Sequence, residues 1–273
     1  MGILRTILYA GNRNDEKSWI RRRYRMGKSC RITGVVHLPP FGADRLDLEG
    51  LESWLLEQIG IHAECGITSM MIQDQTPGEL AGLKNVAILS ALGRTVKRMF
   101  PDLSLGIILE ANNPSAAMYI ANACGADFIR QKVFIGAMVK AGGVMTGRAG
   151  EVWEARKDMD RPVRVLTDIY DRTGVPLGPL PIETAAGQAL KYGSDGLILT
   201  GKNFEESLDL ADRVRKQYPQ APVYLGGGIT EKNVGEAVKH CDGMIVSSCL
   251  LEDGKDNVWS RQKIRRFMEC VCG

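Results

Sequence analysis

One stretch near the C-terminus carries the clearest structural signal in this chain. It runs from Pro222 to Lys255 and reads PVYLGGGITEKNVGEAVKHCDGMIVSSCLLEDGK. A short apolar run, Val223–Leu225, leads into three glycines, and a second run, Met244–Val246, leads into two serines. The pattern predicts two strands that each end in a turn of small residues, with a short helix between them.

The two predicted turns are suited to holding an anion. Glycine has no Cβ, so a glycine turn can bend sharply and approach a ligand closely. Thr230 is predicted to cap the helix that follows, whose first N–H groups and partial positive charge favour anions. In (β/α)8 barrels the loops after strands 7 and 8 often bind phosphate in this way. We therefore predict a phosphate cradle made of Gly226, Gly227, Gly228, Ser247 and Ser248. The alternative is that these are tight turns with only a packing role.

The chain before this stretch alternates apolar runs with helical spacing from Arg31 onward. The runs are near-continuous, which is typical of parallel strands that are covered on both faces. Eight such strands favour a closed barrel over an open doubly wound sheet, and no early GxGxxG opens a helix as a dinucleotide fold requires. The predicted class is α/β: a single (β/α)8 TIM-type barrel over residues 30–273, with a basic extension at residues 1–29.

Two segments between the predicted elements lack a regular pattern. Gly136–Gly147 is rich in glycine and is predicted to be a loop, either a mobile flap over the strand ends or a plain surface loop. Tyr170–Pro181 contains proline and glycine and is predicted to be a long loop.

Composition indicates an ordinary globular protein. The chain has 273 residues, of which 44% are hydrophobic and 25% charged. No apolar run is long enough to span a bilayer, and no clean secretory signal is present. The seven cysteines show no CxxC or Cys/His metal spacing, which predicts reduced, buried thiols and a cytoplasmic protein. The sequence does not fix the oligomeric state, and a homo-oligomer is an open alternative to a monomer.

The first 31 residues are strongly basic, with nine Lys/Arg against two acids, although the net charge of the chain is only +3. This leader could be a targeting helix, or the pattern MGILRT could be myristoylated and assisted by nearby arginines. The alternative is a segment that covers the open bottom of the barrel. A peripheral membrane or organellar location is thus the alternative to the cytoplasm. No nucleic-acid partner is predicted, because no aromatic platform or known module accompanies the charges.

Ionisable residues gather where the predicted strands end, which is where (β/α)8 barrels carry their reactive groups. Buried charges are costly unless they are paired, solvated or functional. The catalytic candidates are His37, Glu110, Lys132 and Asp168, and the substrate-binding candidates outside the cradle are Asp74, Arg130, Thr200 and Lys202.

Each candidate has a chemical role and an alternative. His37 could transfer protons near neutral pH, or it could hold the Pro39-Pro40 turn. Glu110 and Asp168 could act as base and acid, or pair with Arg130 and Lys132. Lys132 could form a Schiff base if desolvation removes its charge, whereas a carboxylate neighbour would favour an ion pair.

No cofactor and no dedicated metal site are predicted. The scattered carboxylates with a single histidine would suit a hard ion such as Mg²⁺ better than Zn²⁺, so Mg²⁺ is the alternative. Paired carboxylates need no ion at all.

Several motifs together resemble the BtpA family, from about Arg31 to the C-terminus. They are GVVHLPP (34–40), GADFIR (125–130), IGAM (135–138), GRAGE (147–151), VPLGPLPIE (175–183) and DGMIVSSCLLEDG (242–254). The resemblance implies a TIM-barrel fold with a phosphate-binding end, and members are labelled photosystem I or membrane-complex biogenesis proteins. It implies no defined reaction.

The chain also departs from the family pattern. Many relatives carry Asn-x-His after strand 4, where this chain has Lys132-Val133-Phe134, and a histidine where it has Tyr170. After strand 3 an arginine-bearing turn is replaced by Glu110-Ala111-Asn112-Asn113. The departures imply a substrate or reaction unlike that of other members, or a lost activity.

The first functional hypothesis is an isomerase, lyase or hydrolase of a small phosphorylated metabolite. The alternatives are a non-catalytic biogenesis factor for a membrane complex of photosystem I type, which contacts the membrane through its basic N-terminus, and a phosphometabolite sensor.

Overall fold

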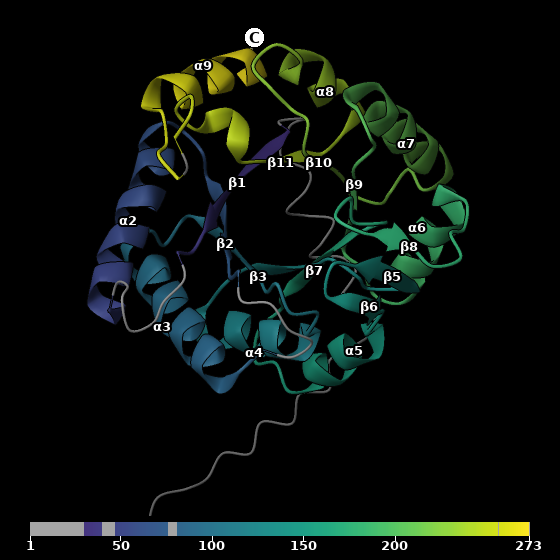
Figure 1. The fold of residues 1–273 in the computed structure, drawn as a ribbon, viewed down its shortest axis with the longest axis horizontal. Coiled ribbons are helices and arrows are strands. Elements are labelled where there is room, and N and C mark those ends of the chain that lie inside the picture. The colour runs from purple at the N-terminus through teal and green to yellow at the C-terminus, as the bar shows by residue number, and fades with distance from the viewer. Residues whose placement is uncertain (1–29, 40–46, 76–80, 256, 273) are drawn as a thin grey trace, which may run out of the picture.

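Parallel strands close into a barrel in the computed structural model, which describes residues 30–39, 47–75, 81–255 and 257–272 (Figure 1). Within these ranges the hydrogen-bonded order is β1-β11-β10-β9-β7-β4-β3-β2, and β2 returns to β1. The strands are β1 Arg31–His37, β2 Ser69–Gln73, β3 Ser104–Ile108, β4 Phe128–Gln131, β7 Arg164–Asp168, β9 Gly196–Leu199, β10 Val223–Gly226 and β11 Gly243–Val246. The predicted (β/α)8 class is confirmed. The predicted extension at residues 1–29 lies outside the described residues.

The helices form a ring around the outside of the barrel (Figure 1). They are α2 Leu48–Glu64, α3 Leu83–Met99, α4 Pro114–Cys124, α5 Ala149–Lys157, α6 Ile182–Lys191, α7 Phe204–Gln217, α8 Val234–His240 and α9 Arg261–Cys272, with a 3₁₀ turn η1 at Ser248–Leu250. In the part of the chain that the structure describes, no helix is both long and apolar enough to cross a membrane.

The inside of the barrel is filled by side chains. One buried layer there consists of Val35, Met71, Phe128, Leu166, Ile198, Tyr224 and Ile245. At the same level β3 contributes Gly106, which pairs with both Met71 and Phe128. A Cβ at Gly106 would lie 2.3 Å from Cε2 of Phe128, so the phenyl ring occupies the space of a β3 side chain. Because the interior is packed, the rim of strand ends is the place where a ligand can be held.

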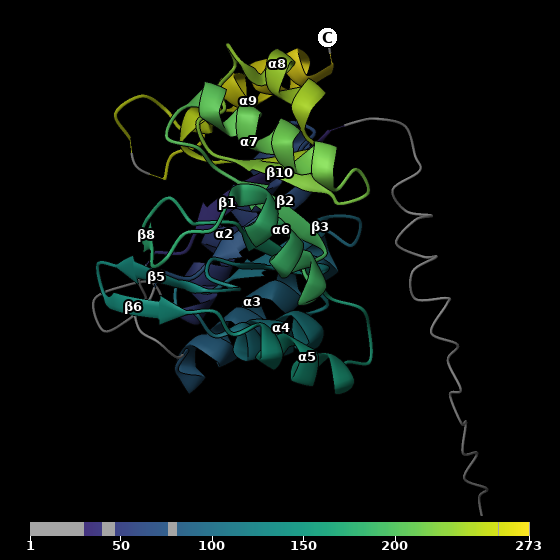
Figure 2. The ribbon, with the colours of Figure 1, turned by 90° about the vertical axis from the view of Figure 1, so that its right-hand side faces the viewer.

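A small antiparallel sheet projects beyond one end of the barrel (Figure 2). Its strands are β5 Ala137–Lys140, β6 Gly143–Thr146 and β8 Val175–Pro176. The prediction of an irregular loop at residues 136–147 is therefore wrong, and the long loop predicted at residues 170–181 contains the two-residue strand β8. Val139 pairs with Val144 within a hairpin and with Val175 from the distant segment. Pairing between remote segments leaves no local periodicity, which is why the sequence pattern missed it.

The turn before α8 differs from its prediction. α8 begins at Val234, and the residue before it is Asn233. The Asn233 carboxamide accepts a hydrogen bond from Thr230 N at 2.7 Å and donates one to the carbonyl of Gly228 at 3.0 Å. The predicted capping of this helix by Thr230 is therefore wrong, because asparagine supplies both the acceptor and the donor that organise the turn.

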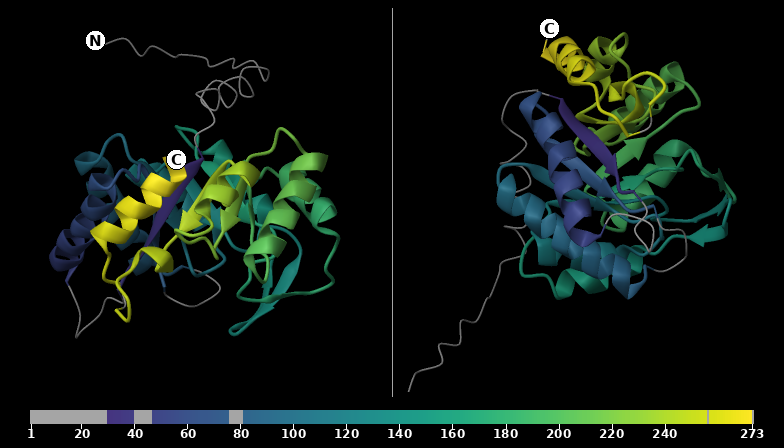
Figure 3. Two further views of the ribbon diagram at one scale, coloured as in Figure 1. Left: turned by 90° about the horizontal axis from the view of Figure 1, so that it is seen from above. Right: turned by 60° about the vertical axis from the view of Figure 1, so that its left-hand side comes forward.

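The first and last strands of the barrel meet where β1 pairs with β11, and we call this pairing the seam. In Figure 3 the yellow helix α9 and the dark blue helix α2 lie next to each other near the purple strand β1 of the seam. At the start of the seam the Sγ atoms of Cys30 and Cys241 lie 3.6 Å apart. The cysteines in the described residues are free thiols. The prediction that they are buried holds for Cys65, Cys124 and Cys241, whereas Cys30 and Cys249 are half-buried and Cys270 of α9 is exposed.

Candidate active site

The rim of the barrel carries a group of interacting polar side chains, which we call the polar cluster. It consists of His37, Gln73, Glu110, Arg130, Lys132 and Asp168, which come from β1, β2, β4, β7 and the segment after β3. The barrel brings these residues together because parallel strands end at the same rim.

Arg130 and Asp168 form a bidentate ion pair between the neighbouring strands β4 and β7. Nε and Nη2 of Arg130 donate to the two carboxylate oxygens of Asp168, each at 2.8 Å. The side chains are 15% and 3% exposed. Such a fork-to-fork contact fixes both side chains in one geometry.

Burial and pairing act in opposite directions on this pair. Burial opposes the charge of Arg130, but the Asp168 carboxylate outweighs it and raises the pKa of the guanidinium. Burial raises the pKa of Asp168, against the opposing effect of Arg130. The pair is ionised at neutral pH, because both carboxylate oxygens accept guanidinium hydrogen bonds and a protonated carboxyl would lose one of these acceptors.

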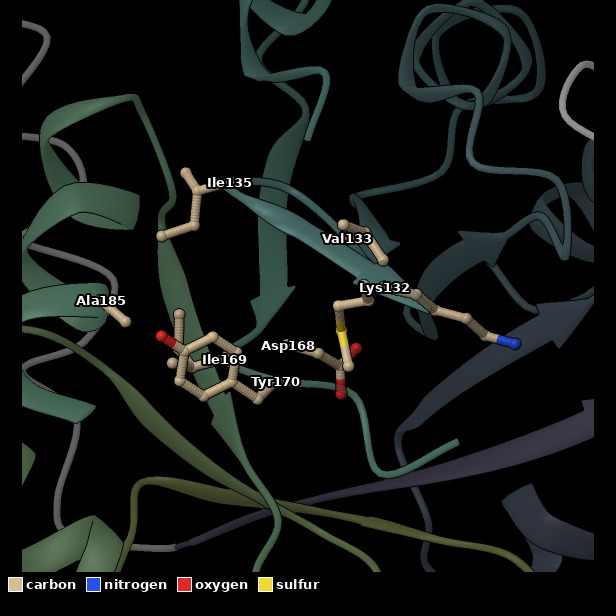
Figure 4. A pocket seen from close by; sticks show the side chains of 8 residues that line it. Lys132, Val133, Ile135, Asp168, Ile169, Tyr170 and Ala185 are labelled. Atoms are coloured by element: carbon tan, nitrogen blue, oxygen red, sulfur yellow. The ribbon is translucent and has the colours of Figure 1, made fainter. Parts of the chain in front are cut away.

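Lys132 makes a second ion pair, with Glu110. Its Nζ lies 2.5 Å from Oε2 of Glu110, and Nε2 of Gln73 donates to the same oxygen at 3.4 Å. In Figure 4 the amine of Lys132 points away from Asp168. Of the two uses predicted for Lys132, this geometry favours the ion pair over the Schiff base, because the carboxylate stabilises the charged amine.

His37 is half-buried at the end of β1, beside these charges. Burial lowers the pKa of His37 below its ordinary value, and the positive charges of Lys132 and Arg130 lower it further. A side-chain hydrogen bond with Gln73 opposes this shift. The imidazole is therefore neutral at pH 7, the form that can accept a proton.

A small cavity lies between the polar cluster and the projecting sheet (Figure 4). Lys132, Asp168, Tyr170 and the buried Met138 of β5 are among the residues that line it. Tyr170 has φ 64°, a conformation that side-chain-bearing residues seldom adopt outside functional sites and tight turns. Its hydroxyl accepts a hydrogen bond from Leu180 N at 2.7 Å, which ties the loop after β7 together.

The predicted phosphate cradle forms a second part of the rim. Gly226 at the end of β10 pairs with Ile245 of β11, so the glycine turn and the serine turn follow neighbouring strands. Within the described residues, no backbone carbonyl or side chain accepts a hydrogen bond from the amides of Gly227 and Gly228, nor from those of Ser247 and Ser248. These donors are available to an external acceptor.

Three other predicted residues take separate positions. Thr200 Oγ1 donates to the carbonyl of Gly226 at 2.6 Å and so joins β9 to the cradle. Lys202 is exposed in the turn before α7. Asp74 is buried and accepts hydrogen bonds from Nδ2 of Asn85 on α3, at 3.2 and 3.3 Å. These hydrogen bonds link the end of β2 to α3.

The structure also places residues at the rim that the sequence pattern did not single out. Asn112 is buried and donates to the carbonyls of Val133 and Thr146, at 3.0 and 2.8 Å, which holds the base of the β5–β6 hairpin. Asp171 and Lys140 form an ion pair between the loop after β7 and β5. The charged residues Asp171 and Arg172, soon after a predicted strand, were the sequence signal that could have singled out Asp171. Its partner Lys140 lies in β5, a strand that the sequence pattern did not predict.

The metal alternative finds no donor cluster in this part of the molecule. In the ranges that the structure describes, no three His, Cys, Asp or Glu side chains are arranged to hold a metal ion. The carboxylates of the polar cluster are instead each paired with a cation.

Comparison with known proteins identifies relatives over nearly the whole chain. A family model described as "BtpA family" matches residues 28–273. The "Photosystem I biogenesis protein BtpA" of Synechocystis sp. is 32% identical over 83% of this chain and 82% of its own. A Pyrococcus furiosus protein named as uncharacterised is 28% identical over 83% of this chain and 88% of its own. Among solved structures, phosphoribosyl anthranilate isomerase from Thermus thermophilus has a TM-score of 0.53 at 16% identity, covering 89% of this chain and 98% of that one, which shows a shared fold.

Proposed function

The chain belongs to the BtpA family, and from that premise we propose that it is an enzyme acting on a small phosphorylated metabolite. The reaction is an isomerisation, epimerisation, aldol-type cleavage or hydrolysis. The turns after β10 and β11 hold the phosphate, and the polar cluster moves protons. The similarity in fold to an isomerase whose printed name specifies a phosphoribosyl compound supports this class of substrate.

The observation that carries the proposal is the set of unused amides in two adjacent turns. Gly227, Gly228, Ser247 and Ser248 present N–H groups that no acceptor in the described residues engages. Gly227 and Ser247 are half-buried and Gly228 and Ser248 are exposed, so water satisfies these N–H groups until a ligand replaces it. A phosphate group offers several oxygens and a negative charge, and so matches a set of donors in two neighbouring turns.

The polar cluster supplies the groups for proton transfer. Neutral His37 accepts a proton from the substrate and returns it as the imidazolium. The ionised Glu110 carboxylate stabilises that charged form, and Asp168 stays paired with Arg130. Arg130 and Lys132 hold the carboxylates in place and stabilise negative charge that develops on the substrate. Asp74, Thr200 and Lys202 remain the further candidates for binding.

A ligand-stabilisation screen tests the proposal. The full chain is heated with sugar phosphates, nucleotides and other phosphate esters, each beside its dephosphorylated counterpart. A ligand at 100 times its Kd stabilises the folded state by about 2.7 kcal/mol, which is a clear rise in Tm. Hits are then incubated with enzyme and followed by NMR for turnover, with His37→Gln and Asp168→Asn as inactive controls. A library in which no phosphate ester raises the Tm more than its counterpart would overturn the proposal.

The name of the Synechocystis relative favours a second function, a non-catalytic factor for assembly of a membrane complex. In that case the barrel is a platform and the basic residues 1–29 contact anionic lipid. Two variants separate the functions in cells. Loss of function with folded Asp168→Asn favours the enzyme, and loss only after removal of residues 1–29 favours the factor. Ligand binding without turnover would instead indicate a phosphometabolite sensor.

A further inference from the structure

A guanidinium group lies across the glycine turn of the cradle. Gly227 follows β10 and has φ 104°. A Cβ built on Gly227 would lie 3.2 Å from Nη1 and 3.4 Å from Cζ of Arg172. Arg172 belongs to the loop that follows β7, the strand that ends at Asp168. The loop therefore brings a positive charge from the side of the polar cluster to the cradle.

Neither side of this contact supplies an acceptor. Within the described residues, the Arg172 guanidinium forms no ion pair or hydrogen bond, and the amides of Gly227 and Gly228 donate to no protein group. A guanidinium has five N–H donors and no acceptor, and a backbone amide is likewise a donor. Donors alone do not stabilise one another. Their shared complement is an anion with several oxygens, and guanidinium geometry suits phosphate in particular.

The residue before Arg172 fixes the loop. Asp171 pairs with Lys140 of β5, and the two side chains are only 4% and 6% exposed. The carboxylate also accepts hydrogen bonds from Thr173, from N at 3.1 Å and from Oγ1 at 2.8 Å. Burial alone would raise the pKa of Asp171, but the hydrogen bonds from Lys140 and Thr173 outweigh it and lower the pKa. The Asp171 side chain is thus a charged anchor between the Arg172 loop and the hairpin.

We propose that Arg172 contacts the phosphate group of a bound phosphate monoester together with the amides of Gly227 and Gly228, and that the Lys140–Asp171 pair positions its loop. The inference rests on the proposed function and adds a specificity-determining cation to it. It also connects two parts of the rim. Met138 of the hairpin lines the cavity beside Lys132 and Asp168, and Lys140 of the hairpin holds the loop whose next residue, Arg172, lies at the glycine turn.

Calorimetric titration of the full chain with inorganic phosphate at low ionic strength tests the first part. Loss of one charge-assisted hydrogen-bonding partner should weaken phosphate binding at least about tenfold in Arg172→Ala. Arg172→Lys keeps the charge but not the forked guanidinium, so its phosphate affinity should lie between those of the wild type and Arg172→Ala. The matched control is Arg98→Ala, an exposed arginine at the end of α3, whose affinity should equal that of the wild type.

The outcomes separate this inference from the proposed function. If the wild type binds phosphate and Arg172→Ala binds it equally well, the role of Arg172 is overturned while the cradle stands. If Gly227→Val abolishes phosphate binding and Arg172→Ala does not, phosphate binds at the glycine turn without Arg172, and the role of Arg172 is again overturned. If the wild type binds neither inorganic phosphate nor any phosphate ester, the proposed function falls and this inference falls with it.

A double-variant cycle tests the positioning role of Lys140. Lys140→Met should weaken phosphate binding, and Lys140→Arg should restore most of it, because the ion pair with Asp171 is kept. In a chain that already carries Arg172→Ala, Lys140→Met should have no further effect on phosphate affinity, although it still lowers stability. Equal losses of phosphate affinity with and without Arg172 would show that Lys140 acts independently of Arg172 and would overturn this part. No loss of affinity in either background would show that the pair acts on stability alone, with the same consequence.

Discussion

Replacing the buried Arg130–Asp168 pair one member at a time should cost far more than replacing both together. Asp168→Leu leaves a buried guanidinium without its partner, and Arg130→Met leaves a carboxylate that is 3% exposed. Breaking a buried pair in this way destabilises proteins by about 3–5 kcal/mol. Arg130 is 15% exposed at the rim, so water relieves part of its charge and the loss for Asp168→Leu should be near the lower value. The double variant removes both charges, and its stability should lie within about 1 kcal/mol of the wild type.

The pH dependence of the two single variants distinguishes which charge is stranded. The lone carboxylate in Arg130→Met can take up a proton, since burial favours its neutral form and raises its pKa above the unfolded value. The free energy of unfolding of Arg130→Met should therefore recover as the pH falls towards 5. The lone guanidinium in Asp168→Leu cannot lose its proton, so that variant should show no such recovery.

Urea unfolding of the four proteins, followed by circular dichroism at pH 7 and pH 5, measures the coupling directly. The control is a second cycle on Glu154 and Lys157, whose side chains are 74% and 67% exposed. An exposed pair should couple by no more than about 0.5 kcal/mol. Simple additivity of the two single losses at Arg130 and Asp168 would refute the account of a buried, mutually dependent ion pair.

Three further predictions follow from contacts elsewhere in the barrel. Gly106→Ala should cost about 1–3 kcal/mol in urea unfolding, because its Cβ would overlap the ring of Phe128, and Phe128→Leu in the same chain should recover much of this loss. Burial lowers the pKa of His62, so the unfolded chain binds a proton first. Stability should be complete above about pH 6.5 and decline below it by up to about 1.4 kcal/mol per pH unit, with a shallower slope in His62→Gln. Asn112→Ala removes the two hydrogen bonds to the hairpin base, which should cost about 1–3 kcal/mol and speed limited proteolysis within residues 136–147 relative to other sites. Unchanged cleavage there would contradict the anchoring role of Asn112.

The sequence pattern was sufficient for the barrel and for the meeting of its strand-end side chains at one rim. Apolar runs ended at His37, Arg130 and Asp168, and the rule that parallel strands end together placed these side chains at one rim. Consecutive strands are neighbours in such a barrel, so the proximity of Arg130 to Asp168 followed from the predicted class. The direction of a side chain did not follow: Asp74 also ends a strand, yet its carboxylate meets Asn85 of α3.

The parts that the sequence did not predict lie in the loops. Arg172 reaches Gly227 only because the chain turns back at Tyr170, whose φ of 64° has no signature in a non-glycine residue. The same is true of the projecting sheet, whose strand β8 pairs with β5 across more than thirty residues. Periodicity reports which face of an element is buried. It does not report which part of the barrel a loop contacts, and the pairing of Lys140 with Asp171 depends on the path of the loop after β7.

The thiols of Cys30 and Cys241 lie 3.6 Å apart where the barrel closes on itself, and 211 positions separate them in the chain. A disulfide there would link the two ends of the sheet and enclose the strands from β1 to β10 in one covalent ring, with β11 directly after it. Chain entropy alone assigns a ring of that size about 5 kcal/mol of stabilisation. Reduced and oxidised samples would then differ in thermal stability, and the reducing agent in the buffer would decide which of the two stabilities a calorimeter measures.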